Sequence, residues 1–197
     1  MSKEKRLIEK EDLLPSDVYA KSRKQIRKDL VEFKKDRRIA LGPYATFYFE
    51  SFETMVAQVQ EMLHIEKGGD EQLKDELIAY NPLVPNGKEL TVTLMFEIDN
   101  PITLAAFLGK VGGIEEKIFI KINDEIVKAV PEEDVDRTSA EGKASSVQFI
   151  HFKLNVDQVS KFKSDSVTIE LGIDHKDYTH TTRLAENSVK SLCADFI

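Results

Sequence analysis

Apolar positions recur along this chain with two periods, one helical and one extended. Helical spacing, with apolar residues at i, i+3, i+4 and i+7, predicts a helix after Pro15, in which Ser16 is the expected N-cap, and a second helix after Ser51. The first apolar stripe consists of Ile26, Leu30 and Phe33, and the second of Phe52, Met55, Val56, Val59, Met62 and Leu63. Shorter helices are expected from Asp70, from Asn100 to Gly112-Gly113, from Asn155 to Phe162 and near the C-terminus.

Alternating apolar and polar residues predict the strands. They are expected at residues 45–50, 88–99, 118–122, 125–130, 146–154 and 167–173. Residues 118–130 look like a hairpin around Asn123-Asp124, whereas residues 131–145 and His175–His180 are expected to be loops. This mixed order predicts an α+β fold: one domain with a mixed or mainly antiparallel sheet, flanked by helices and preceded by a basic N-terminal helix.

Charge is distributed unevenly and suggests a division of the chain. Residues 1–40 contain thirteen Lys/Arg and eight Asp/Glu, a net charge of +5, whereas the other 157 residues contain fifteen and twenty-seven, a net charge of −12. We therefore expect a basic helical arm over residues 1–40 and an acidic α+β body over residues 41–197. Such an arm could pack on its own body, on a second subunit in a homodimer or on an acidic partner.

Composition excludes several classes of protein. The charged N-terminus lacks the apolar core of a signal peptide, no apolar run approaches the ~20 residues of a membrane span, and Cys193 is the single cysteine. We expect a cytoplasmic protein without a membrane segment. No P-loop, dinucleotide-binding or hydrolase motif occurs, so whether the chain is an enzyme is open. Nucleic acid is an unlikely partner because the chain as a whole is acidic.

Four residue positions form the candidate metal site. Asp174, His175 and His180 lie close together in the sequence, and His151 could join them if its strand is a neighbour. Imidazole and carboxylate side chains would suit iron, zinc or manganese, although a hydrogen-bonded surface loop explains the same residues. A Glu-x-x-His pair, Glu61 and His64, is discounted because the helical wheel places Glu61 toward solvent.

Glu97 is the carboxylate that stands out in the predicted strand 88–99. It shares a strand face with Thr91, Thr93 and Met95, and it could require a cationic partner such as Arg38 or Lys117. A structural ion pair is the simplest interpretation of Glu97, and a general base or an anion site is the alternative.

An ordered set of short strings resembles an uncharacterised bacterial family, domain-of-unknown-function family 3501. The strings are Arg37-Arg-Ile-Ala-Leu-Gly-Pro43, Phe49-Glu50, Gln60-Glu-Met62, Ile65-Glu66, Tyr80-Asn-Pro-Leu-Val-Pro85, Ser145-Ser-Val147 with Phe149 and Phe152, and Gly172-Ile-Asp-His175 with Tyr178. The resemblance covers nearly the whole chain. It implies that a shared site lies among the Tyr80–Pro85 loop, including Asn81 and Pro82, Glu97 and Asp174-His175.

The resemblance also implies a cellular setting. Members of that family are often encoded beside rubrerythrin-like proteins and iron–sulfur oxidoreductases, which suggests redox or peroxide-stress partners. This chain has His64, Gln148 and His151 where the family tends to have Arg, His and Arg, so a site that needs those side chains would be altered here. The leading hypothesis is an accessory protein that acts by protein–protein contact. The alternative is a metal- or anion-binding enzyme or sensor with a site near Glu97, Asp174 and His175, and Arg38 beside Glu97.

Overall fold

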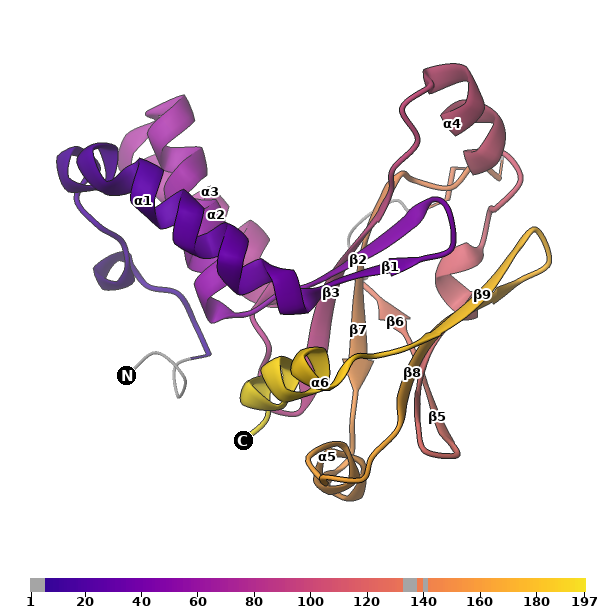
Figure 1. The fold of residues 1–197 in the computed structure, drawn as a ribbon. Helices are drawn as coiled ribbons and strands as arrows, with labels where there is room; N and C mark the ends of the chain where they lie inside the picture. Colours follow the sequence, from indigo (N-terminus) through magenta and orange to yellow (C-terminus); the bar gives the residue numbers. More distant parts are fainter. Residues whose placement is uncertain (1–5, 133–137, 140–141) are drawn as a thin grey trace.

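The computed structural model describes residues 6–132, 138–139 and 142–197, and it shows an α+β domain with two antiparallel sheets (Figure 1). The first sheet has the strand order β1-β2-β3-β7-β6 and the second has the order β5-β4-β8-β9. The strands are β1 (Arg38–Leu41), β2 (Ala45–Phe49), β3 (Glu89–Phe96), β4 (Ile118–Ile122), β5 (Glu125–Lys128), β6 (Val130–Pro131), β7 (Val147–Lys153), β8 (Ile169–His175) and β9 (Tyr178–Arg183). The α+β prediction is confirmed, with two sheets where one was expected.

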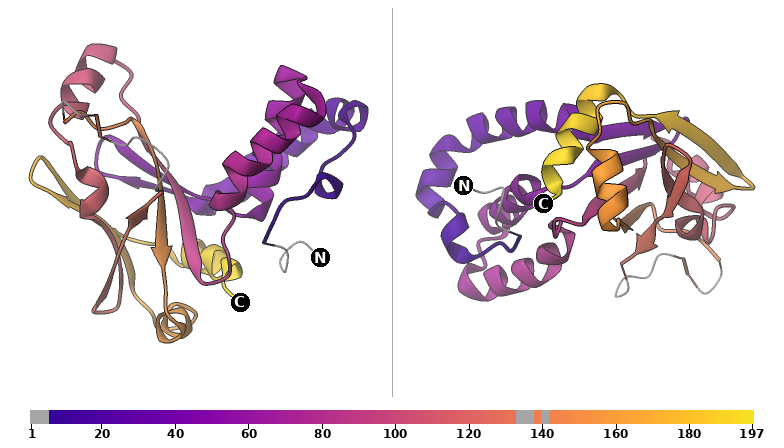
Figure 2. Two further views of the ribbon diagram at one scale, coloured as in Figure 1. Left: turned by 180° about the vertical axis from the view of Figure 1, so that it is seen from behind. Right: turned by 90° about the horizontal axis from the view of Figure 1, so that it is seen from below.

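Six α-helices accompany the sheets in the described part of the chain. They are α1 (Ser16–Lys34), α2 (Phe52–Glu66), α3 (Gly69–Tyr80), α4 (Pro101–Leu108), α5 (Val156–Phe162) and α6 (Glu186–Leu192). Helices α1, α2 and α3 form a group that projects from the sheets, while α4 projects from a different side (Figures 1 and 2). None of the helices in the described ranges is long and apolar enough to cross a membrane.

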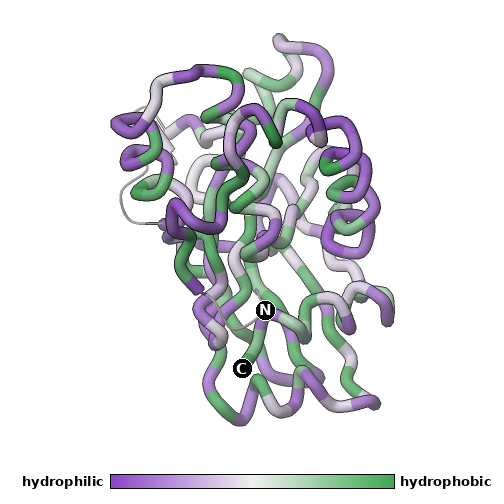
Figure 3. Tube along the Cα trace, turned by 90° about the vertical axis from the view of Figure 1, so that its left-hand side faces the viewer, coloured by the Kyte–Doolittle hydropathy of each residue, from purple (hydrophilic) through white to green (hydrophobic). Residues whose placement is uncertain are grey.

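The main core lies between the two sheets. Alternation in β3 directs Leu90, Val92 and Leu94 into this core, and Ile118 and Ile120 of β4 enter it from the second sheet. In the tube view, hydrophobic segments follow the strands, whereas the projecting helices mix hydrophobic and hydrophilic positions (Figure 3). Strand alternation therefore accounts for the body of the molecule.

A second, smaller core lies where α2 and α3 meet the opposite face of the first sheet. It contains the apolar side of α2, with Met55 and Val59 fully or nearly buried, together with Leu73 of α3 and Leu83-Val84 after it. Ile8 of the N-terminal segment is also buried here. This face of the sheet carries Thr91 and Thr93, so polar side chains are enclosed beneath the helices.

Several predicted boundaries are wrong. Pro15, not Ser16, is the N-cap of α1, and Gly68, not Asp70, is the N-cap of α3. Helix α4 ends at Leu108 instead of continuing to Gly112-Gly113, because Leu108 and Val111 turn into the core.

The expected loop His175–His180 instead contains the tight turn of a hairpin and the start of a further strand. Strand β8 continues to His175, two residues make the turn, and β9 begins at Tyr178. The predicted loop over residues 131–145 contains the end of β6, and its residues 133–137 and 140–141 lie outside the described part of the chain. Arg38–Leu41, at the predicted boundary between arm and body, forms β1 of the first sheet.

Candidate functional site

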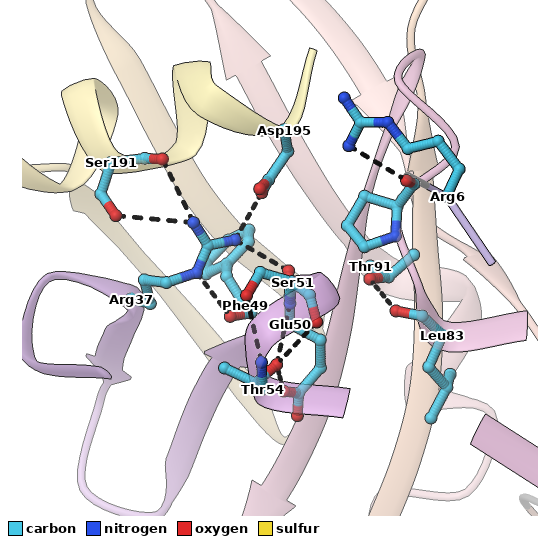
Figure 4. A network of polar contacts seen from close by, with 11 residues as sticks. Arg6, Arg37, Phe49, Glu50, Ser51, Thr54, Leu83, Thr91, Ser191 and Asp195 are labelled. Atoms are coloured by element: carbon cyan, nitrogen blue, oxygen red, sulfur yellow. Dashed lines mark hydrogen bonds and ion pairs between the residues drawn. The ribbon is translucent and has the colours of Figure 1, made fainter. Parts of the chain in front are cut away.

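Arg37 is the centre of a buried polar network that joins the end of α1 to the sheet and to the C-terminus (Figure 4). Its Nε donates to the carbonyl oxygen of Phe49 at 3.0 Å, and Nη2 donates to that of Glu50 at 2.7 Å. Nη1 donates to the carbonyl oxygen of Ser191 at 3.2 Å, and Nη2 forms an ion pair with Asp195. All three guanidinium nitrogens are bound to protein, so this arginine holds three segments together.

Asp195 is the buried acid of this network. Burial raises the pKa of its carboxyl group to about 6, although the charge of Arg37 and its hydrogen bond favour the ionised form. The carboxyl group is therefore mainly ionised at neutral pH and compensates the charge of Arg37. Charge counting includes Arg37 among the thirteen cations of the expected basic arm, but its side chain is only 2% exposed and lies inside this network.

A second buried acid, Glu50, lies beside this network (Figure 4). Its two carboxylate oxygens accept hydrogen bonds from Thr93 at 2.7 Å and from Thr54 at 2.6 Å. Ser51 caps α2 by accepting a hydrogen bond from the Thr54 backbone, as predicted. Because hydroxyl donors satisfy both oxygens of Glu50, the cluster fastens the start of α2 to β3.

Glu97 forms an exposed ion-pair cluster on the outer face of the first sheet. It accepts hydrogen bonds from Thr46 at 2.5 Å and Tyr48 at 2.9 Å, and Arg38 lies 3.3 Å away. The hydrogen bond from Thr46 contributes most to lowering the pKa of Glu97, and Tyr48 and Arg38 act in the same direction against burial. The Arg38 partner proposed from the sequence is present. A ligand-binding role for Arg38 and Glu97 stays a prediction.

Asn81 and Pro82 belong to a short 3-10 helix, Asn81–Leu83, that follows α3. The Asn81 side chain accepts a hydrogen bond from the backbone of Ile8 at 2.7 Å and donates to its carbonyl oxygen at 3.2 Å. Both amide atoms of Asn81 therefore hold the N-terminal segment against the second core. This contact gives Asn81 a structural role, and its predicted ligand binding is untested.

The candidate metal ligands lie on different surfaces. His175 and His180 share a face of the β8–β9 hairpin, but Asp174 lies on the opposite face. His151 belongs to β7 of the first sheet. Among the residues that the structure describes, no group of three or more His, Cys, Asp or Glu side chains could hold a metal ion.

The surroundings of the two hairpin histidines explain their orientation. His175 is buried, and its Nδ1 accepts a hydrogen bond from the Asp177 backbone at 3.2 Å across the turn. The His180 ring packs edge-on against Tyr178 and so closely over Gly42 that a Cβ atom there would lie 2.5 Å from the ring. The His180 imidazole thus packs the hairpin against the β1–β2 turn, whereas the His175 imidazole stabilises the turn of the hairpin itself.

His151 lies between two carboxylates that sequence reasoning did not connect with it. Its Nε2 is 2.6 Å from Glu132, and its Nδ1 is 3.3 Å from the buried Glu89, an ion-pair distance with poor hydrogen-bond alignment. Burial alone would lower the pKa of His151, but Glu89 and Glu132 outweigh it and raise the pKa. The two carboxylates lie on opposite sides of the ring, an arrangement that favours a proton over a shared metal ion.

Helix α1 is attached to α2 through Glu61. This carboxylate accepts a hydrogen bond from Tyr19 at 2.7 Å and forms an ion pair with Arg23. These contacts lower the pKa of Glu61 to about 2, the hydrogen bond from Arg23 contributing most. The prediction that Glu61 points to solvent is wrong, because α1 covers that side of α2. His64 packs edge-on against the ring of Tyr19.

The opposite side of α1 is cationic. We call Lys21, Lys24, Lys28 and Lys35 the lysine stripe; all four side chains are exposed. They follow one another at helical spacing on the side away from Ile26 and Leu30. Lys24 and Lys28, at its centre, form no ion pair with any described residue, and Val31 beside them is 65% exposed.

Comparison with known proteins gives a family and a fold but no activity. A family described as protein of unknown function (DUF3501) matches residues 7–196. A crystal structure of a novel protein of unknown function from Burkholderia pseudomallei is 34% identical, covers 96% of this chain and 99% of its own, and superposes with a TM-score of 0.90. The search of curated proteins gave no match.

Proposed function

The chain belongs to the DUF3501 family, and we propose that it is an accessory protein that acts in the cytoplasm by binding a redox protein through α1. The redox class of the partner follows from the family resemblance described above. The binding surface follows from the lysine stripe. The two parts of the proposal are therefore separable by experiment.

The lysine stripe is the observation that carries the proposal. Where α1 and the turn after it face the rest of the molecule, Arg23 is paired with Glu61 and Arg37 with Asp195. Lys24 and Lys28 are instead exposed and without an ion pair among the described residues. Unpaired cations beside an exposed apolar side chain, Val31, favour a contact with an acidic protein surface.

The buried polar networks support the same proposal. Arg37, Glu50 and Asn81 each use their polar atoms in contacts that hold segments of this chain together. Glu97 is likewise fully engaged by Thr46, Tyr48 and Arg38. Because these side chains are used to stabilise the fold, the exposed side of α1 is the surface that we assign to partner binding.

Capture from a cell extract tests the proposal. The tagged chain is expected to retain a rubrerythrin-like or iron–sulfur protein, identified by mass spectrometry, and a Lys24→Glu/Lys28→Glu variant is expected to lose it. Lys128→Glu/Lys153→Glu is the matched control, because it changes net charge equally at exposed lysines of the body. Equal retention by both variants would exclude the lysine stripe, and recovery of no redox protein above background would exclude the partner class.

A metal-binding role is the second candidate. Its basis is that His175 and His180 share a face of one hairpin; Asp174 lies on the opposite face, so the two histidines would be the ligands from this hairpin. Elemental analysis of untagged protein purified without chelator tests it. Near-stoichiometric iron, zinc or manganese that His175→Ala abolishes would favour this candidate over a purely accessory role.

A further inference from the structure

Helix α4 is an apolar helix whose outer side has no partner in the described structure. Residues 100–109 contain no charged side chain. The inner side of α4 packs on the body, where Phe107 contacts Tyr44 and Phe96. On the outer side, Ile102 is 79% exposed, and Ala105 and Ala106 follow it at i+3 and i+4. Because the two neighbouring side chains are small, α4 can approach another apolar surface closely enough for Ile102 to contact it.

A groove of about 390 Å³ between α1 and α2 also lacks an occupant among the described residues. Apolar side chains from both helices form most of its lining. They are Ile26, Leu30 and Phe33 of α1 and Phe52, Val56 and Ala57 of α2. Ile26 and Leu30 are only half-buried and Phe33 is 39% exposed, so the apolar stripe predicted for α1 is incompletely covered.

The helix and the groove cannot meet within one molecule. Both ribbon views place α4 and the α1–α2 pair at separate ends of the first sheet (Figures 1 and 2). The groove is nevertheless long enough to hold α4. The eight residues of α4 extend about 12 Å, and the groove follows α1 from Tyr19 to Phe33, about 21 Å along the helix axis.

Charge supports the same pairing. Lys110 lies two residues beyond the end of α4, and Asp29 lines the groove. Neither forms an ion pair with a described residue; Asp29 accepts a hydrogen bond from Gln25 of its own helix. Packing α4 into the groove would bring a cation at the end of the helix toward an acid on the groove wall.

We propose that α4 of one copy of the chain packs into the α1–α2 groove of a second copy, with Ile102 as the buried anchor and Lys110 facing Asp29. If each copy supplies one helix and one groove, the exchange closes into a two-fold symmetric dimer. This surface is on the opposite side of α1 from the lysine stripe. An experiment can therefore exclude the dimer contact without excluding the partner contact, and the reverse.

Sedimentation across a concentration series of the full chain tests the dimer. Wild type is expected to dimerise, and Ile102→Asp to weaken the dimer by roughly thirtyfold or more, as loss of a buried anchor does. Leu30→Asp, on the groove wall, is expected to do the same. The matched controls Val156→Asp and Val31→Asp, at positions 78% and 65% exposed, are expected to remain dimeric. Circular dichroism establishes that each variant is folded.

Two further measurements identify the contact. Mixing Ile102→Asp with Leu30→Asp restores one intact helix–groove contact per pair and should give a heterodimer. Lys110→Asp and Asp29→Lys should each weaken the dimer, and the double variant should recover it. A wild type that stays monomeric up to its solubility limit overturns the proposal, as does a dimer that Ile102→Asp or Leu30→Asp leaves unchanged.

Discussion

Arg37 connects three segments that lie far apart in the sequence: the end of α1, the end of β2 and the C-terminal segment. A fully buried guanidinium must be both hydrogen-bonded and charge-compensated, and here Phe49, Glu50, Ser191 and Asp195 do this. We predict that Arg37→Met lowers the free energy of unfolding by about 3–5 kcal/mol, because it leaves Asp195 buried without its cation. Urea denaturation followed by circular dichroism measures the change.

The double variant Arg37→Met/Asp195→Leu separates the charge from the packing. Removing both partners should recover a large part of the stability lost in Arg37→Met, since no uncompensated charge is left. If Arg37→Met alone costs less than about 1 kcal/mol, the network is not the anchor described here.

His151 predicts a pH dependence of stability. Its pKa is raised in the folded protein from an ordinary value of 6.5 because Glu89 and Glu132 hold the protonated ring. The stabilising contribution is thus complete below pH 6.5 and disappears as pH rises through the folded pKa. Wild type should lose stability relative to His151→Gln over that range. An NMR titration that gives His151 a pKa below 6.5 would contradict the assignment.

The spacing of apolar residues in the sequence indicates that Arg37 is buried, although a count of charges does not. Arg37 follows Phe33 by four residues, so it continues the apolar stripe of Ile26, Leu30 and Phe33 by one turn. A cation on the buried side of a helix needs a buried acid, but Asp195 is 158 residues away, and sequence spacing does not reveal that pairing. The Glu97–Arg38 pair could be proposed because a carboxylate in the predicted strand 88–99 needs a cationic partner, although β1, which contains Arg38, was not predicted.

At the scale of elements, Glu61 fixes α1 on α2. The contacts from Arg23 and Tyr19 lower its pKa to about 2 from a usual 4.5, so their stabilisation is present above pH 4.5 and is lost as pH falls toward 2. We predict that Glu61→Gln costs about 1–2 kcal/mol at neutral pH, after allowance for partial exposure. The difference from wild type should shrink at acidic pH, as measured by urea denaturation. A constant difference would exclude the ionic contact.

The start of α2 gives a simpler test. Ser51→Ala removes the N-cap hydrogen bond to Thr54 and should destabilise the protein by about 1 kcal/mol in thermal or urea unfolding. Ser160→Ala, at an exposed position inside α5, is the control and should be nearly neutral. Equal effects of the two substitutions would mean that the cap contributes nothing.

Elements with strong periodicity were predictable, whereas those decided by tertiary contacts were not. The stripe of α2, the alternation of β3 and the Asn155 capping box of α5 all have their predicted form. Strand β9 was missed because the turn before Tyr178 has no glycine or proline to mark it. Tyr178 shows why it forms: the strand places its hydroxyl group to accept from the backbone of Ala45 at 3.0 Å, which ties the two sheets.

At the scale of the whole molecule, the two sheets separate residues that the sequence places close together. Asp174, His175 and His180 span one hairpin but two of its faces, whereas His151 belongs to the other sheet and Glu97 directly follows its strand β3. The uneven distribution of charge predicted a surface better than the Asp/His cluster predicted a site, because the lysine stripe lies on the exposed side of α1. The sequence could not show that α1 also borders an apolar groove, since that depends on how α1 and α2 cross.

The central claim is that the lysine stripe binds an acidic redox partner, and the most direct test is calorimetry with a purified rubrerythrin-like protein at two salt concentrations. The account predicts binding at low salt that weakens as salt rises, because exposed charges are screened. It also predicts that Lys24→Glu/Lys28→Glu weakens binding at least about tenfold while Lys128→Glu/Lys153→Glu does not. Binding that is indifferent to salt and to the Lys24/Lys28 change would contradict it.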